Sequence, residues 1–174
     1  MRRLGVIVAL GALVGILGGA VTASPALAGG RGDGWQLMPA APFTLDPSFC
    51  GFPVRDTPVV NKEYAKVLKA ADGSMIFLVT GFVEVSFTNL STGKTIFENT
   101  SGPGKATLNA DGSITLALKG HNAFLLTTAD AARFGLPNLF VSAGALTITV
   151  APDGNITSLS LQGHVLVDVC AALS

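Results

Sequence analysis

The sequence predicts an all-β protein, an antiparallel meander of about eight strands that forms a closed or nearly closed barrel. Three observations support this fold class. Apolar and polar residues alternate over most of the chain beyond residue 50, Asp-Gly dipeptides separate the alternating segments, and only one short segment has helix character. Long strands favour closure because closure removes exposed edges. A two-sheet β-sandwich is the alternative architecture.

The start of the sequence predicts an export signal. Arg2 and Arg3 form a positive head, residues 4–21 are apolar, and Ala26-Leu-Ala28 matches the small-x-small pattern of a signal peptidase site. The apolar stretch is long enough to be a retained membrane anchor, which needs about 20 residues, and such an anchor is the alternative. Its glycines and the cleavage pattern favour removal of residues 1–28, cleavage after Ala28 and a secreted protein without a membrane span.

Charge excludes some partners. Removal of residues 1–28 takes away two arginines and no acid, which leaves 9 basic and 11 acidic residues. A net charge of −2 argues against nucleic acid or an anionic membrane as partner. The mature length suits one domain, and we assign it to residues 49–174.

Residues 29–48 are rich in Gly and Pro and show no periodicity, which predicts a flexible N-terminal arm. The arm contains Arg31, Gly32 and Asp33, the tripeptide that integrins read. Three specified residues arise easily by chance in such a segment, so no role is assigned to them.

Strands are expected in order along the rest of the chain, separated by turns at Asp72-Gly73, Thr92-Gly93, Asp111-Gly112 and Asp153-Gly154. Residues 128–134 form the one short helix, which Gly135 and Pro137 end. The meander resembles a lipocalin-like or similar barrel in its strand number. The expected strands are residues 62–69, 74–88, 93–99, 105–109, 114–126, 139–142, 145–150 and 156–169.

A threefold repeat joins an Asp-Gly turn, an alternating strand and a glycine nine or ten residues after the Asp. The alternation predicts that Gly81, Gly120 and Gly163 face the core and mark bends in the strands. His121 and His164 follow two of these glycines and lie on polar faces. A zinc site needs three or four protein ligands, so we predict neither a metal nor another cofactor.

Cys50 and Cys170 are the only cysteines. In an exported chain with an even count, a disulfide is the default interpretation. It would close a loop of about 120 residues and contribute at most about 4 to 5 kcal/mol in the chain-entropy model. A metal pair or a reactive thiol remains the alternative, although no motif supports either.

The function class predicted is a secreted, non-catalytic binding or structural module. A small barrel either fills with side chains or holds one apolar ligand. The inward residues that would line such a ligand are Phe77, Val83, Phe87, Leu118, Phe124 and Leu161.

An isomerase-type or hydrolase-type enzyme with a site at the barrel mouth is the alternative, and an inward carboxylate with a perturbed pKa would support it. The carboxylates noted are Glu63, Glu84, Glu98 and Asp168, which are scattered singly along the chain. We predict no catalytic residue.

The segment Cys50-Gly-Phe-Pro-Val54 and the ending Asp168-Val-Cys-Ala-Ala-Leu173 resemble the start and end of a group of small exported proteins of actinobacteria. The resemblance covers roughly residues 50–173. It implies export, a disulfide that joins the ends of the fold and a β architecture, and it supplies no catalytic residue.

Overall fold

A computed structural model describes residues 30–31 and 33–174. The described chain forms one ten-stranded sheet and two short helices. In chain order the elements are β1 (Gly30–Arg31), β2 (Trp35–Leu37), β3 (Phe43–Leu45), β4 (Val54–Lys69), β5 (Met75–Asn89), β6 (Thr95–Asn99), β7 (Gly104–Leu108), β8 (Ile114–Leu125), α1 (Thr128–Phe134), β9 (Leu139–Val150), β10 (Ile156–Asp168) and α2 (Val169–Leu173). The predicted export signal lies outside the described residues.

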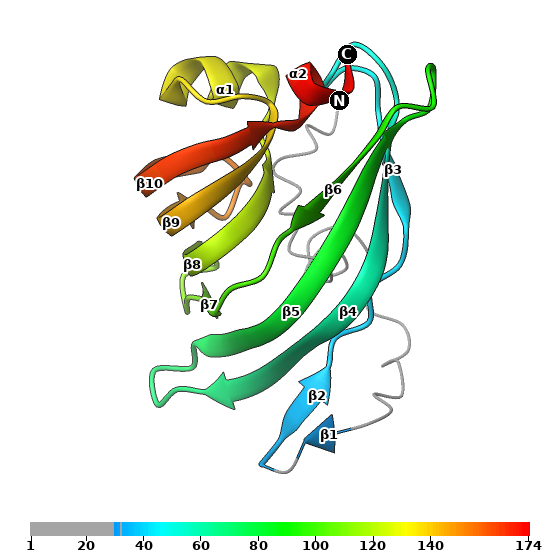
Figure 1. The fold of residues 1–174 in the computed structure, drawn as a ribbon. Coiled ribbons are helices and arrows are strands. Elements are labelled where there is room, and N and C mark those ends of the chain that lie inside the picture. Colours follow the sequence, from blue (N-terminus) through cyan, green and yellow to red (C-terminus); the bar gives the residue numbers. More distant parts are fainter. Residues whose placement is uncertain (1–29, 32) are drawn as a thin grey trace.

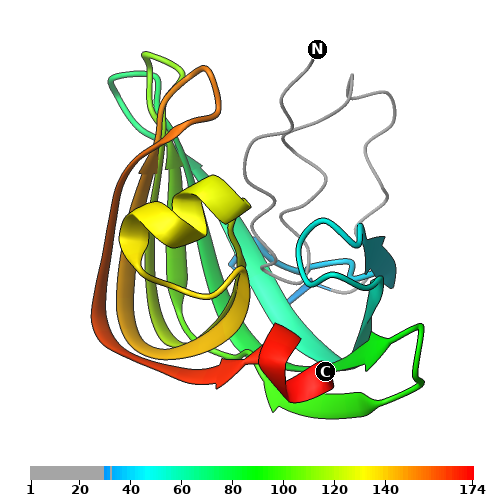
Figure 2. The same ribbon diagram turned by 90° about the horizontal axis from the view of Figure 1, so that it is seen from above.

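Every strand pair in the sheet is antiparallel. The strand order is β1-β2-β4-β5-β7-β8-β9-β10, while β3 pairs with β4 and β6 pairs with β5. The sheet coils strongly (Figures 1 and 2). Within the described ranges no pair joins β10 back to β4. The all-β antiparallel class is therefore confirmed, and a closed barrel is not.

Two short parts of the N-terminal arm pair with β4, which its composition does not predict. Gln36 and Leu37 of β2 pair with β4, and Phe43 to Leu45 of β3 pair with the start of the same strand. β4 is 16 residues long, and its outer edge would otherwise present unpaired backbone groups. Tertiary pairing thus orders short segments that have too few residues to show a period.

Two strand boundaries also differ from the prediction. β4 begins at Val54 and not near residue 62, because a register shift between Pro58 and Val60 interrupts its alternation. Residues 139–142 and 145–150 belong to the single strand β9, since Ala143 and Gly144 stay in register with both neighbouring strands.

The predicted helix is confirmed as α1, and its N-cap is Thr127. The Thr127 hydroxyl accepts a hydrogen bond from the Asp130 N–H, and Gly135 ends the helix in the left-handed conformation. In the described part of the chain no helix is long and apolar enough to cross a membrane.

The predicted disulfide joins Cys50 to Cys170, across 120 positions in the sequence. It ties the segment between β3 and β4 to α2 at the C-terminal end. The Asn89 side-chain amide also donates to the Leu173 carbonyl, at 3.1 Å. The disulfide thus holds α2 against the segment before β4, and the hydrogen bond holds it against the end of β5.

The repeated glycines mark a bend, but they do not face the core. Gly120, Gly144 and Gly163 pair with one another across β8, β9 and β10. Gly81, Gly120 and Gly163 are exposed. A Cβ at Gly144 would lie 2.8 Å from the Gly163 Cα, so it would point sideways into the next strand. Simple alternation therefore predicts the wrong direction for the repeated glycines. The strands bend where Gly120, Gly144 and Gly163 pair, and their backbones leave no room there for a side chain.

Two apolar clusters lie on opposite faces of β8 and β9. Leu116, Leu118, Phe124 and Phe140 belong to the first cluster, which α1 covers through Ala131. The second cluster uses the alternate residues of the same strands. Its buried members are Leu45, Val54, Val83, Val85, Phe87, Ala123, Leu125, Leu139, Val141, Val169 and Leu173. The far half of β5 therefore packs beneath β8 and β9, and this end of the molecule has two buried layers.

Candidate functional site

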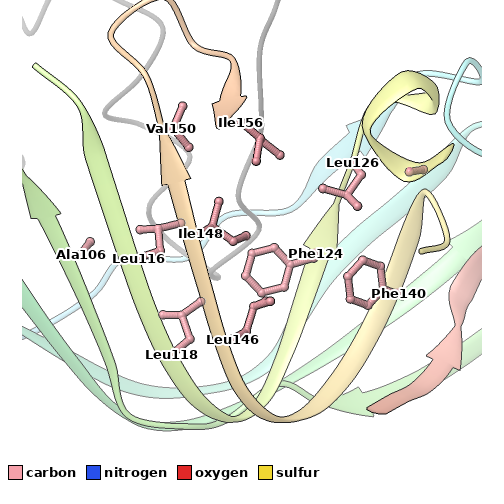
Figure 3. Packing of buried hydrophobic residues seen from close by; sticks show 11 residues of the cluster. Ala106, Leu116, Leu118, Phe124, Leu126, Phe140, Leu146, Ile148, Val150 and Ile156 are labelled. Atoms are coloured by element: carbon pink, nitrogen blue, oxygen red, sulfur yellow. The ribbon is translucent and has the colours of Figure 1, made fainter. Parts of the chain in front are cut away.

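The centre of the inner face of the sheet is a filled core, while Val67 at its edge is 50% exposed. One register row crosses six strands from Val67 through Phe77, Ala106, Leu116 and Ile148 to Leu159. Figure 3 shows side chains of the first cluster rising from the strands into the hollow side of the sheet. Leu116 and Ile148 are 3% and 0% exposed, which places the centre of the row fully inside.

The structure divides the six predicted ligand-lining residues between the two clusters. Phe77, Leu118, Phe124 and Leu161 belong to the first, while Val83 and Phe87 belong to the second. Since β8 and β9 separate the clusters, one apolar pocket lined by all six does not form. A ligand in either cluster stays a prediction.

Two buried carboxylates on β4 are the most perturbed acids of the described chain. Asp56 and Glu63 are 4% and 3% exposed. Burial raises the pKa of each to about 7, and no charged neighbour contributes to either shift. Glu63 pairs with Gly81 and Asp56 with Phe87, so both carboxyls lie on the apolar side of β4. Glu63 was predicted only as a single, scattered carboxylate, and Asp56 was not predicted as a candidate residue.

These two carboxylates do not form a catalytic pair. Their partners on β5 are six residues apart, which corresponds to roughly 20 Å along a strand. The carboxyl pair of a glycosidase stands about 5 to 10 Å apart. A perturbed inward carboxylate is what the enzyme alternative requires, but each of these is isolated from the other.

The two histidines lie in one row. Both His121 of β8 and His164 of β10 pair with Ala143 of β9 between them. Their Cα atoms are therefore about 10 Å apart, two strand spacings. The charge of His121 lowers the pKa of Glu98, against the stronger raising effect of burial. In the described ranges no three His, Cys, Asp or Glu side chains are grouped as a metal would need.

The outer face of the sheet carries lysine and other polar side chains along two register rows. One row crosses the same six strands as the inner row, one residue away. Its members are Lys66, Leu78, Lys105, Ala117, Thr147 and Ser160. The next row toward the bend includes Lys119, Ala145 and Gln162. We call these nine residues the outer lysine face.

A shallow depression of about 380 Å³ lies in the outer lysine face. Ala117, Ala145 and Thr147 form part of its floor, and Lys105 and Lys119 stand at its sides. Pro103, Gly104 and Leu118 complete the lining. The depression exists because small side chains occupy the middle of β8 and β9 while long ones flank them. Its apolar floor and cationic sides can hold a ligand that combines C–H surface with polar groups.

None of the lysines of this face was predicted to be a site residue. The strand alternation places each of them outward, and that signal was available. Their association requires the register of β4, β5, β7 and β8, which brings together positions up to 53 residues apart in the sequence. The net charge of the chain gives no indication of it.

Comparisons of the chain with protein-family models, with curated proteins and with solved structures gave no match. The resemblance to exported actinobacterial proteins thus stays a prediction.

Proposed function

We propose that the protein is exported without residues 1–28 and acts as a non-catalytic binding module that holds a polysaccharide on its outer lysine face. In this proposal the coiled sheet is a filled, nearly closed barrel whose interior serves as a scaffold. The Cys50–Cys170 disulfide supports export, because disulfides persist in oxidising compartments.

The depression between Lys105 and Lys119 is the observation that carries this proposal. Sugar rings present C–H groups on their faces and hydroxyls on their edges. The alanines of the floor suit the ring faces, and Thr147, Ser160 and Gln162 can exchange hydrogen bonds with hydroxyls. All three are exposed. Small molecules usually bind in enclosed pockets. An open, shallow site along the two register rows of the outer lysine face therefore suits a polymer better.

The positions of the two buried carboxylates, Asp56 and Glu63, also favour a non-catalytic role for this face. Acid–base catalysis needs a group within hydrogen-bond reach of the reacting atom. Asp56 and Glu63 lie on the opposite face of β4 from Lys66, so neither can serve a ligand on the outer lysine face.

Filling the depression tests the proposal. Ala145→Tyr adds a bulky side chain to the floor, and tyrosine is compatible with a strand. We expect it to abolish retardation of the mature protein in native gels that contain a polysaccharide. Ser158→Tyr is the matched control, because residue 158 is exposed on β10 and does not line the depression. Equal retardation of wild type and Ala145→Tyr, or none of the wild type by any polysaccharide, would overturn the proposal.

A further inference from the structure

The lysines of the outer lysine face carry positive charge that the described structure leaves unpaired. Lys105 and Lys119 are exposed and Lys66 is half-buried. The described residues provide no ion pair or hydrogen bond to the ammonium group of any of the three. Unpaired like charges on one face repel one another, and an anion bound between them removes that repulsion.

The register sets the spacing of these charges. Lys66 and Lys105 both pair with Leu78 from opposite sides, so their Cα atoms are about 10 Å apart. Lys105 pairs with Ala117, and Lys119 lies two residues further along β8. Its Cα is therefore about 8 Å from that of Lys105. Long, flexible stems let the three ammonium groups follow a chain of anionic groups across the strands.

Strands β4 to β10 contribute no acidic residue to this region, and Asp33 lies beyond them, next to Gly34, where a Cβ would be 3.8 Å from the Lys66 Cε. The three rows that include Lys66, Lys119 and Thr115 carry no Asp or Glu in the paired strands β4 to β10. Asp72, Asp111 and Asp153 instead occupy the hairpin turns, where N–H and side-chain donors of the residue two positions on lower their pKa. A chain with a net negative mature charge therefore has a local cationic face.

We propose, building on the function inferred above, that the ligand is a linear anionic polysaccharide whose charged groups bind Lys66, Lys105 and Lys119. Carboxylate, sulfate or phosphate substituents would pair with the ammonium groups. The sugar hydroxyls between them would bond to Thr147, Ser160 and Gln162. Single-stranded nucleic acid is less suited to the site, because it binds through aromatic stacking and no residue lining the depression is aromatic.

Affinity measurements with matched polymers test the charge of the ligand. The probes are polygalacturonate, dextran sulfate, neutral dextran and a single-stranded oligonucleotide, each titrated into the mature disulfide-bonded protein. We expect binding to at least one anionic polysaccharide, weakening as salt screens the charges. Each of Lys66→Gln, Lys105→Gln and Lys119→Gln should reduce affinity about two- to five-fold, and the triple variant by more than any single one.

Lys69→Gln is the matched control. It removes one positive charge from β4 on the opposite face, where Lys69 pairs with Met75, and should leave affinity within two-fold. Thermal unfolding of every variant should match the wild type, since surface substitutions usually have small effects.

The outcomes separate the two proposals. Equal binding of neutral dextran and the anionic polymers, with loss in Ala145→Tyr, would overturn the anionic ligand and keep the polysaccharide module. Stronger binding of the oligonucleotide would overturn the ligand class. A Lys69→Gln effect equal to those of the other lysines would overturn the assigned face. Failure of every polymer to bind would overturn both proposals.

Discussion

Two neighbouring rows of the same six strands differ completely in character. The inner row from Val67 to Leu159 is apolar throughout, while the outer row from Lys66 to Ser160 carries two lysines and two hydroxyls. A shift of one residue along each strand separates them, because successive side chains point to opposite faces. The difference shows that strand alternation divides this domain into a scaffold face and a candidate binding face.

Removal of the Cys50–Cys170 disulfide should have the largest effect on the stability of the scaffold. Cys50→Ser with Cys170→Ser removes the link across 120 positions. We expect a loss of about 2 to 5 kcal/mol in the free energy of unfolding, because the unlinked denatured chain gains conformational freedom. Urea unfolding of the double variant and the wild type measures it. Coincident urea midpoints of the two proteins would show that the disulfide does not stabilise the fold.

The inner and outer rows should respond differently to truncation. Leu116→Ala should lower the free energy of unfolding by about 2 to 5 kcal/mol, since it leaves a cavity among buried neighbours. Thr147→Ala on the outer row should change it by less than about 0.5 kcal/mol. Chemical denaturation of both variants provides the comparison. Similar losses would contradict the assignment of the outer row to solvent.

The buried carboxyl of Glu63 should make stability depend on pH. Its pKa is about 7 in the folded protein, above the ordinary value of 4.5, so the native state holds its proton more tightly. The contribution of Glu63 to the free energy of unfolding is then largest below pH 4.5, falls as pH rises toward 7 and is level above pH 7. The contribution is on the order of 3 kcal/mol.

Glu63→Gln keeps the shape and removes the titration, so its stability should depend less on pH over that range. Denaturation midpoints at several pH values measure both proteins. A wild-type midpoint that rises from pH 4.5 to pH 7, or an identical slope in the variant, would contradict the role of this carboxyl.

The glycine row where the strands approach should tolerate no side chain. Gly144 has a φ of +117°, which side chains rarely adopt, and a Cβ would contact the backbone of β10. Gly144→Ala should therefore destabilise the fold by about 1 to 3 kcal/mol. Gly154→Ala is the comparison, because its φ of +85° is also positive but it lies in a hairpin turn at the end of the sheet. Calorimetry that ranks Gly154→Ala as the worse variant would contradict a close approach at Gly144.

Local patterns predicted those features that depend on a few consecutive residues. The helix at 128–134 follows from the glycine that ends it, although its N-cap, Thr127, was not predicted. The Asp-Gly turns follow from the need for positive φ. The cysteine count and the export pattern indicated the disulfide. The direction of Gly120 and the order in β2 and β3 were not predicted, because bending and edge pairing depend on the neighbouring strands.

The sequence by itself determined the β class, the inward row of apolar residues and the pairing of Cys50 with Cys170, since each follows from local alternation or simple counting. Only the tertiary structure decided that the sheet coils without closing in its described part. It also decided that Phe77 and Phe87 enter different clusters and that Lys66, Lys105 and Lys119 share one face. The physical reason is register: alternation fixes which side a residue faces, but only strand pairing fixes which distant residues lie beside it.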